Sequence, residues 1–216
     1  MQECQSGGDS ILRSVYVMGM VNRRSPPVES MPRHQCLIYS GDPSDLLKAL
    51  AATIRERLKA NYRCLYLNSP PMVARIRACL VNRGVNVDRE IANSNLQLTS
   101  GQEHLVKGVF DPGRMLDMLK EAIASALADG HAGLWASGDM AWEFGPERDF
   151  TKLVEYELGL EDLLYAQPAL CGVCQYCADT LPEGVVRSGS ELHSALFINE
   201  TLSRMNPHYI VGRSRN

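Results

Sequence analysis

The chain has 216 residues, of which 45% are hydrophobic and 22% charged, a composition typical of one medium-sized globular domain with short extensions. Its formal net charge of −3 and its scattered lysines and arginines argue against direct nucleic-acid binding. No apolar run approaches the roughly 20 residues that span a bilayer, and the start does not resemble a signal peptide. We therefore expect a cytoplasmic protein without membrane contact, whose seven cysteines are mostly reduced.

The chain divides into one organised block and two short ends. Residues 1–31 hold glycine, arginine and proline pairs and predict an N-terminal tail. Residues 32–212 predict a single domain, and residues 213–216 predict a C-terminal tail. Within the block, short apolar runs alternate with segments of helical period, which indicates an α/β fold with a mostly parallel sheet flanked by helices. The predicted strands are 36–39, 64–67, 96–99, 133–137, 170–176 and 194–198.

Start signals mark the predicted helices. Asp42 is expected to cap a helix that has Pro43 in its first turn, and Ser69-Pro70 and Asp111-Pro112 repeat the arrangement. The segment after Pro112 carries an apolar stripe of the ordinary core-facing kind, and Gly130 follows it as the expected end of the helix.

The carboxyl ends of parallel strands are where ligands gather in sheets of this type. Tyr39, Asp139 and Tyr176 fall at such ends, and Trp142 follows Asp139 closely. Asp139 could anchor a ligand, act as a general base or cap a helix. The chain contains no Gly-Lys-Ser/Thr, no G-x-G-x-x-G and no G-x-S-x-G, so three common enzyme classes lose their main support. We expect no catalytic residues and no bound cofactor.

Cysteines and histidines are the candidate metal ligands. Cys171, Cys174 and Cys177 lie close in sequence, but side chains alternate along a strand, so the three cannot converge on one ion. We therefore expect buried thiols and no metal. His34 and His193 each precede a predicted strand and could place an imidazole at a sheet edge or bond a nearby carbonyl. The remaining histidines are expected to be solvated, namely His104, His131 and His208.

Several short motifs, in order from His34 to about Tyr209, together resemble the MEDS domain, the sensory domain of methanogens, methylotrophs and the dichloromethane-dehalogenase regulator. They include His34-Gln35-Cys36-Leu37-Ile38-Tyr39, Arg63-Cys64-Leu65-Tyr66, Phe110-Asp111-Pro112, Gly138-Asp139-Met140-Ala141-Trp142, Tyr156-Glu157, Cys174-Gln175-Tyr176 and Asn206-Pro207.

The resemblance implies a RecA-like sheet without a P-loop and a role in prokaryotic signal transduction, where such domains are thought to sense small hydrocarbon derivatives. The positions that it singles out are His34, Tyr39, Asp139, Trp142, Cys174, Tyr176 and His193. It implies a histidine kinase or a transcription regulator as signalling partner, and a homodimer is compatible with it.

The sequence therefore predicts a non-catalytic sensory domain that binds a small organic effector. Two alternatives stay open at this point. One is a degenerate nucleotide-binding domain of RecA-like fold that holds phosphate on helix N-termini. The other is a protein interaction or dimerisation module, for which a large exposed apolar patch without a pocket would be the sign.

Overall fold

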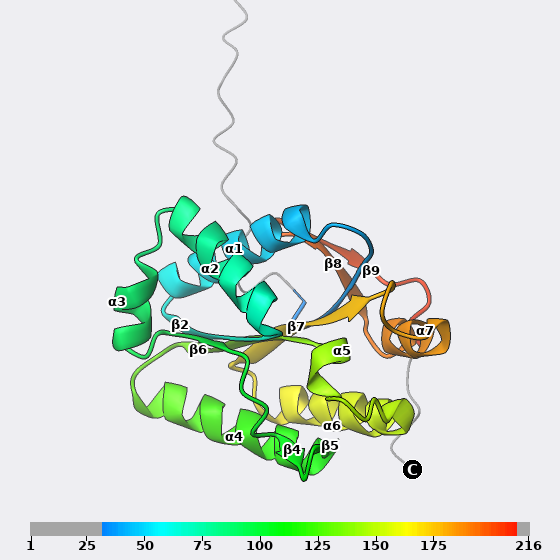
Figure 1. Ribbon diagram of the computed structural model, residues 1–216. Helices are drawn as coiled ribbons and strands as arrows, with labels where there is room; N and C mark the ends of the chain where they lie inside the picture. The colour runs from blue at the N-terminus through cyan, green and yellow to red at the C-terminus, as the bar shows by residue number, and fades with distance from the viewer. Residues whose placement is uncertain (1–31, 211–216) are drawn as a thin grey trace, which may run out of the picture.

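A computed structural model of the chain describes residues 32–210, and the predicted tails 1–31 and 213–216 lie outside the described residues. A seven-stranded sheet with strand order β3-β2-β6-β7-β1-β8-β9 forms the centre of the molecule (Figure 1). Its strands are β1 (His34–Tyr39), β2 (Tyr62–Leu67), β3 (Leu96–Thr99), β6 (Gly133–Asp139), β7 (Leu170–Cys177), β8 (Ala195–Asn199) and β9 (Leu202–Met205). The short strands β4 (Leu105–Val106) and β5 (Val109–Phe110) form a separate hairpin.

The helices are α1 (Ser44–Lys59), α2 (Pro70–Asn82), α3 (Val87–Ala92), α4 (Pro112–Ala128), α5 (Met140–Glu143), α6 (Leu153–Ala166) and α7 (Glu183–Glu191), with a 3₁₀ turn η2 (Phe150–Lys152) before α6. None of the helices within residues 32–210 is long and apolar enough to cross a membrane.

The mostly parallel sheet that the sequence predicts is confirmed. Five of the neighbouring strand pairs are parallel, and β9 alone pairs antiparallel with β8. All six predicted strands are present, several of them longer by a few residues. The β4–β5 hairpin and β9 escape prediction because two-residue strands and a largely exposed edge strand leave no apolar run to detect.

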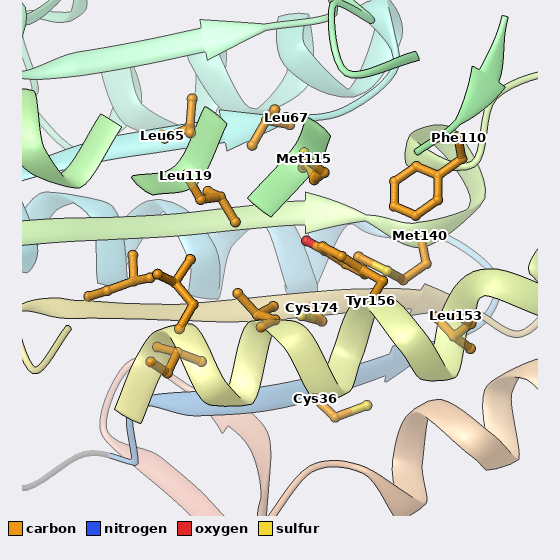
Figure 2. Packing of buried hydrophobic residues seen from close by; sticks show 14 of the residues in the cluster. Cys36, Leu65, Leu67, Phe110, Met115, Leu119, Met140, Leu153, Tyr156 and Cys174 are labelled. Atoms are coloured by element: carbon orange, nitrogen blue, oxygen red, sulfur yellow. The ribbon is translucent and has the colours of Figure 1, made fainter. Parts of the chain in front are cut away.

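Helices cover both faces of the sheet, so the fold has three layers. The first core lies on the side of α1, α2 and α3, and the second lies on the side of α4 and α6 (Figure 1). Leu65 and Leu67 from β2, together with Met115 and Leu119 from α4, point into the second core (Figure 2). Because side chains alternate along β7, Cys171 belongs to the first core and Cys174 to the second, as the sequence predicts.

Local capping sets where several helices begin. Asp111 caps α4 by accepting a hydrogen bond from the backbone N–H of Arg114 at 2.7 Å, with Pro112 as the first helical residue, as expected. The predicted cap at Asp42 is confirmed only in part: Pro43 is the N-cap residue of α1, but the Asp42 carboxylate accepts a hydrogen bond from the backbone N–H of Ser44, the first helical residue, at 3.3 Å. The same Asp42 oxygen also accepts a hydrogen bond from Arg75 at 2.7 Å.

Candidate functional site

Three of the predicted site residues meet at the carboxyl end of the sheet. Tyr39, at the end of β1, donates its hydroxyl to Oδ2 of Asp139 at 2.9 Å. Asp139 ends β6, and its Oδ1 caps α5 by accepting from the backbone N–H of Trp142 at 3.1 Å. Asp139 is buried, and burial raises the pKa of its carboxyl group. Both carboxyl oxygens are engaged, so the helix-capping interpretation of Asp139 describes its geometry.

The loop before the β4–β5 hairpin folds against α5 and buries His104, which the sequence predicts to be solvated. The His104 ring lies 5.5 Å from that of Trp142, measured between centroids, and its Nε2 lies 2.7 Å from the carbonyl oxygen of Glu143. Gln102 also donates to the carbonyl of Trp142. The sequence could not predict the burial of His104, because the residues that cover it are remote from it in sequence.

The other four predicted residues lie in a separate buried cluster on the α6 side of the sheet. His34 begins β1 and His193 lies two residues before β8, while Cys174 and Tyr176 come from β7. Since β8 pairs parallel with β1, both histidines lie at the amino ends of their strands. The seven predicted residues therefore form two groups rather than one. The histidines lie at the opposite end of the strands from the carboxyl ends, where the sequence predicts ligand binding.

Glu157 of α6 stands at the centre of this cluster. Its Oε2 lies 3.4 Å from Nε2 of His34 and 3.5 Å from Nε2 of His193. Its Oε1 accepts a hydrogen bond from the hydroxyl of Tyr176. Cys174 places its Sγ 3.6 Å from Nε2 of His34 and 3.9 Å from the same Glu157 oxygen. Polar groups from β1, β7, α6 and the segment before β8 thus converge on one buried point.

The outer nitrogens of the two imidazoles are also held. Nδ1 of His34 lies 2.7 Å from Oε2 of Glu161, one helical turn after Glu157. Nδ1 of His193 lies 2.7 Å from the carbonyl oxygen of Gly189 in α7, which is the carbonyl contact that the sequence offers as one interpretation of this histidine. Nε2 of His193 has no hydrogen-bond partner among the described residues.

The two imidazoles compete for one carboxylate. Burial acts to lower the pKa of His34, but its contacts with Glu157 and Glu161 outweigh burial and raise that pKa to about 9. Burial and the charge of His34 lower the pKa of His193 to about 4. Burial alone would raise the pKa of Glu157, but the nearby imidazoles and the Tyr176 hydroxyl bring it to about 2. The pKa values therefore favour an ionised Glu157 and a protonated His34 in this cluster.

The acidic members of the cluster, Glu157 and Glu161, are absent from the sequence-based set of site residues. A sequence signal for Glu157 exists, because it falls among the apolar positions Tyr156, Leu160 and Leu164, and in the structure it is only 1% exposed. A carboxyl group on the apolar face of a helix requires a partner, and Glu161 lies four residues further on the same face. Their histidine partners come from remote strands, so sequence spacing alone could not supply the pairing.

A pocket of about 30 Å³ adjoins the cluster between the sheet and helices α4 and α6. His34 and Cys174 form part of its wall, and Glu143 of α5 contributes a buried carboxyl group. Met115 and Leu119 of α4 and Tyr156 of α6 also line it, and Figure 2 shows these three side chains in the second core. Its apolar walls include Leu67, Met115, Leu119, Ala136, Leu160 and Leu164.

Glu143 is the unusual group in this pocket. Burial, reinforced by the charges of Glu157 and Asp139, raises the pKa of its carboxyl group well above the ordinary range, which favours the protonated form. Its Oε2 has no hydrogen-bond partner within the part of the chain that the structure describes. Room for the side chain exists because residue 138 is glycine: a Cβ there would lie 1.5 Å from Oε1 of Glu143.

Residues 33–194 match the family described as MEDS, the MEthanogen/methylotroph, DcmR Sensory domain. The chain belongs to the MEDS family. This match covers more than half of the chain and includes His34, Glu143, Glu157, Cys174 and His193. No curated protein matches the chain. As a member of a sensory family, this MEDS domain has a role in signal transduction, and the cluster and the adjoining pocket both lie within the matched segment.

Proposed function

We propose that this MEDS domain is a non-catalytic sensor that binds a small organic molecule in the pocket beside Glu143. The observation that carries the proposal is the combination of size and chemistry in this pocket. Its volume is about 30 Å³, and its walls are apolar apart from a few polar groups. Ligand sites commonly combine apolar walls with a small number of placed polar groups.

The volume limits the ligand to a very small molecule. By the same measure a single water molecule needs about 10–15 Å³, so the pocket accepts roughly two or three non-hydrogen atoms without rearrangement. The raised pKa of Glu143 favours a protonated carboxyl group, which offers a hydrogen-bond donor as well as acceptors, and its Oε2 has no partner among the described residues. Short alcohols, aldehydes and halocarbons are small enough for this volume and can contact the carboxyl group. They are small hydrocarbon derivatives, the class of effector that the family resemblance implies.

The route from the pocket to a partner passes through the elements that line it. His34 and Cys174 belong both to the pocket wall and to the cluster around Glu157. That cluster connects β1 and β7 to α6, and through the Gly189 carbonyl it reaches α7. A ligand that moves the shared side chains would therefore change how α6 and α7 pack. A separate histidine kinase or transcription regulator would receive this change.

Contacts in the first strand-to-helix turn weigh against the nucleotide-binding alternative. Gly41, in the turn between β1 and α1, donates its backbone N–H to the carboxylate of Asp179 at 2.6 Å. The Asp42 carboxylate lies in the same turn. A phosphate group would meet negative charge there, and an N–H group that could bind it already has a carboxylate partner.

A separate observation favours a protein partner at the sheet edge, as the interaction-module alternative requires. Ile198 of β8 and Leu202 and Met205 of the edge strand β9 are 47%, 52% and 74% exposed. Exposed apolar side chains beside an edge strand are typical of contact surfaces. The pocket gives ligand sensing the stronger support, and this edge is a place where the sensor could meet its partner or a second copy.

Thermal unfolding with added ligands tests the proposal. Short alcohols, aldehydes and dichloromethane are compared with Mg-nucleotides on the wild-type chain, on Ala136→Val and on Ala169→Val. Ala136 lines the pocket, whereas Ala169 packs against the same core without lining it. A ligand at about 100 times its Kd stabilises the native state by about 2.7 kcal/mol, or roughly 5–10 °C in Tm.

We expect at least one small organic molecule to raise the Tm of the wild type and of Ala169→Val, and to have no effect on Ala136→Val. Stabilisation by Mg-nucleotides alone would replace the proposal with nucleotide binding. No stabilisation by either set, or equal stabilisation of the two valine variants, would rule out this pocket as the sensing site.

A further inference from the structure

Four donor groups of different chemistry meet inside the second core. The side chains of His34, Glu157, Cys174 and His193 are all buried, and each offers a ligand atom within 4.8 Å of the other three. Two imidazoles, a thiol and a carboxyl group are the side chains that bind zinc in proteins. Such a concentration of polar groups in an apolar core requires a compensating interaction.

Four of the six separations between these atoms are close to those around a single tetrahedral ion. Ligands at the usual zinc distances of about 2.0–2.3 Å lie about 3.3–3.6 Å apart at the corners of a tetrahedron. Oε2 of Glu157 lies 3.4 Å from His34, 3.5 Å from His193 and 3.9 Å from Cys174. His34 and Cys174 are 3.6 Å apart. Three of these four separations fall within the expected range, and the fourth exceeds it by a few tenths of an ångström.

The outer hydrogen bonds orient the donors toward the same point. Glu161 holds Nδ1 of His34, and the Gly189 carbonyl holds Nδ1 of His193, which leaves both Nε2 atoms directed inward. Tyr176 occupies Oε1 of Glu157 and leaves Oε2 for the centre. Histidine ligands of metals characteristically bond a carboxylate or a carbonyl through their second nitrogen. Nε2 of His193 is buried and, among residues 32–210, has no hydrogen-bond partner.

We propose that His34, Glu157, Cys174 and His193 bind one divalent transition-metal ion, of which zinc fits best. A thiolate and a carboxylate neutralise the two charges of the ion, so the complete site carries no net charge in the core. Four protein ligands close the coordination sphere, which is the arrangement of a structural site. The ion would fix β1, β7, α6 and the segment before β8 relative to one another.

This inference revises the expectation that the chain holds no metal. Cys171, Cys174 and Cys177 do not converge on this ion, since only Cys174 is one of its ligands. The other ligands come from strands and a helix that are remote in sequence. The competing explanation is a hydrogen-bonded ion pair between His34 and Glu157 without metal, and it leaves Nε2 of His193 and the Cys174 thiol with only long contacts.

Cobalt binding tests the site, because Co²⁺ takes zinc ligands and reports them by absorption. The full chain, purified without an affinity tag and stripped with a chelator, is titrated with Co²⁺ and then with competing Zn²⁺. We expect one equivalent per chain, intense visible bands of a tetrahedral ion and a thiolate-to-cobalt charge-transfer band, all abolished by zinc. Circular dichroism of each variant confirms that it is folded.

Three variants locate the ion. Cys174→Ser should lose the charge-transfer band and at least tenfold in affinity, while Cys177→Ser on the same strand should keep both. Glu161→Gln should keep the band and bind about 10- to 100-fold more weakly, as loss of an outer partner does. The Glu161 side chain is half exposed, so this variant should keep the fold. The absence of saturable binding, or equal behaviour of Cys174→Ser and Cys177→Ser, would overturn the proposal.

The experiments on the metal site and on the organic-ligand pocket have separate outcomes. Stabilisation by small organic molecules is measured through Ala136→Val and Ala169→Val, neither of which changes a proposed metal ligand. Cobalt absorption without organic-ligand stabilisation would leave the metal site and remove the proposed sensing pocket. The reverse result would leave the pocket and remove the ion.

Discussion

Glu143 and Glu157 are both buried carboxyl groups on the same side of the sheet, yet their surroundings drive their pKa values in opposite directions. Glu157 has two imidazoles and the Tyr176 hydroxyl around it and stays ionised. Glu143 has the carboxylates of Glu157 and Asp139 nearby and a hydrogen bond to Tyr156, and burial raises its pKa well above the ordinary range. Glu157 is thereby suited to bind a cation, and Glu143 is suited to form hydrogen bonds with a neutral ligand.

Gly138→Ala tests how Glu143 is placed. The added Cβ would lie 1.5 Å from Oε1 of Glu143, so the carboxyl group must move or the strand must shift. We expect a loss of about 1–3 kcal/mol in the free energy of unfolding, measured by urea denaturation. In a Glu143→Ala background the same change should cost little, because the clashing atoms are gone. An equal cost in both backgrounds would show that another contact explains the glycine.

At the scale of elements, α7 is positioned by a close approach to β7. A Cβ on Gly189 would lie 2.3 Å from the ring of Tyr176, so the helix reaches this depth only with glycine there. The Gly189 carbonyl bonds His193, and Tyr176 bonds Glu157. The packing of α7 is thus coupled to the buried cluster, which makes α7 a suitable element to report a change in it.

Two glycines in α7 provide a matched comparison. Gly189→Ala should reduce the free energy of unfolding by about 1–3 kcal/mol, because the Tyr176 ring must leave its place. Gly184→Ala meets open space and should be neutral or stabilising by up to about 1 kcal/mol, since alanine loses less backbone entropy. Chemical denaturation of both variants measures the difference. Equal effects would mean that the approach of α7 to Tyr176 is not tight.

At the scale of the whole molecule, the two cores share one sheet. Alternate residues of β2, β6 and β7 point into opposite cores, as Trp135 and Leu134 do on β6. Loss of packing on one face would therefore disturb the strands that support the other. The described residues should unfold as one unit, although helices cover both faces.

Tryptophan fluorescence can check this cooperativity. The chain has two tryptophans, and Trp142→Phe leaves only Trp135, which is 1% exposed in the first core. In urea, the midpoint from Trp135 fluorescence should coincide with the midpoint from far-ultraviolet circular dichroism. Two separated transitions would show that the cores unfold independently.

Local signals in the sequence determined the secondary structure and the fold class of this protein. Short apolar runs marked six buried strands, and Asp111-Pro112 marked the start of α4, because strand burial and helix capping depend on neighbouring residues. The order of MEDS motifs determined the family as well. The boundaries 32–212 of the predicted domain stay a prediction.

Tertiary structure decided which polar residues meet. The direction of β8 placed His193 beside His34 at the amino ends of parallel strands, and no spacing in the sequence encodes that direction. The packing of α6 brought Glu157 to both histidines, and the packing of the loop before β4 against α5 buried His104. Contacts between residues more than 100 positions apart depend on strand order and helix placement, and those are properties of the whole chain rather than of any segment in it.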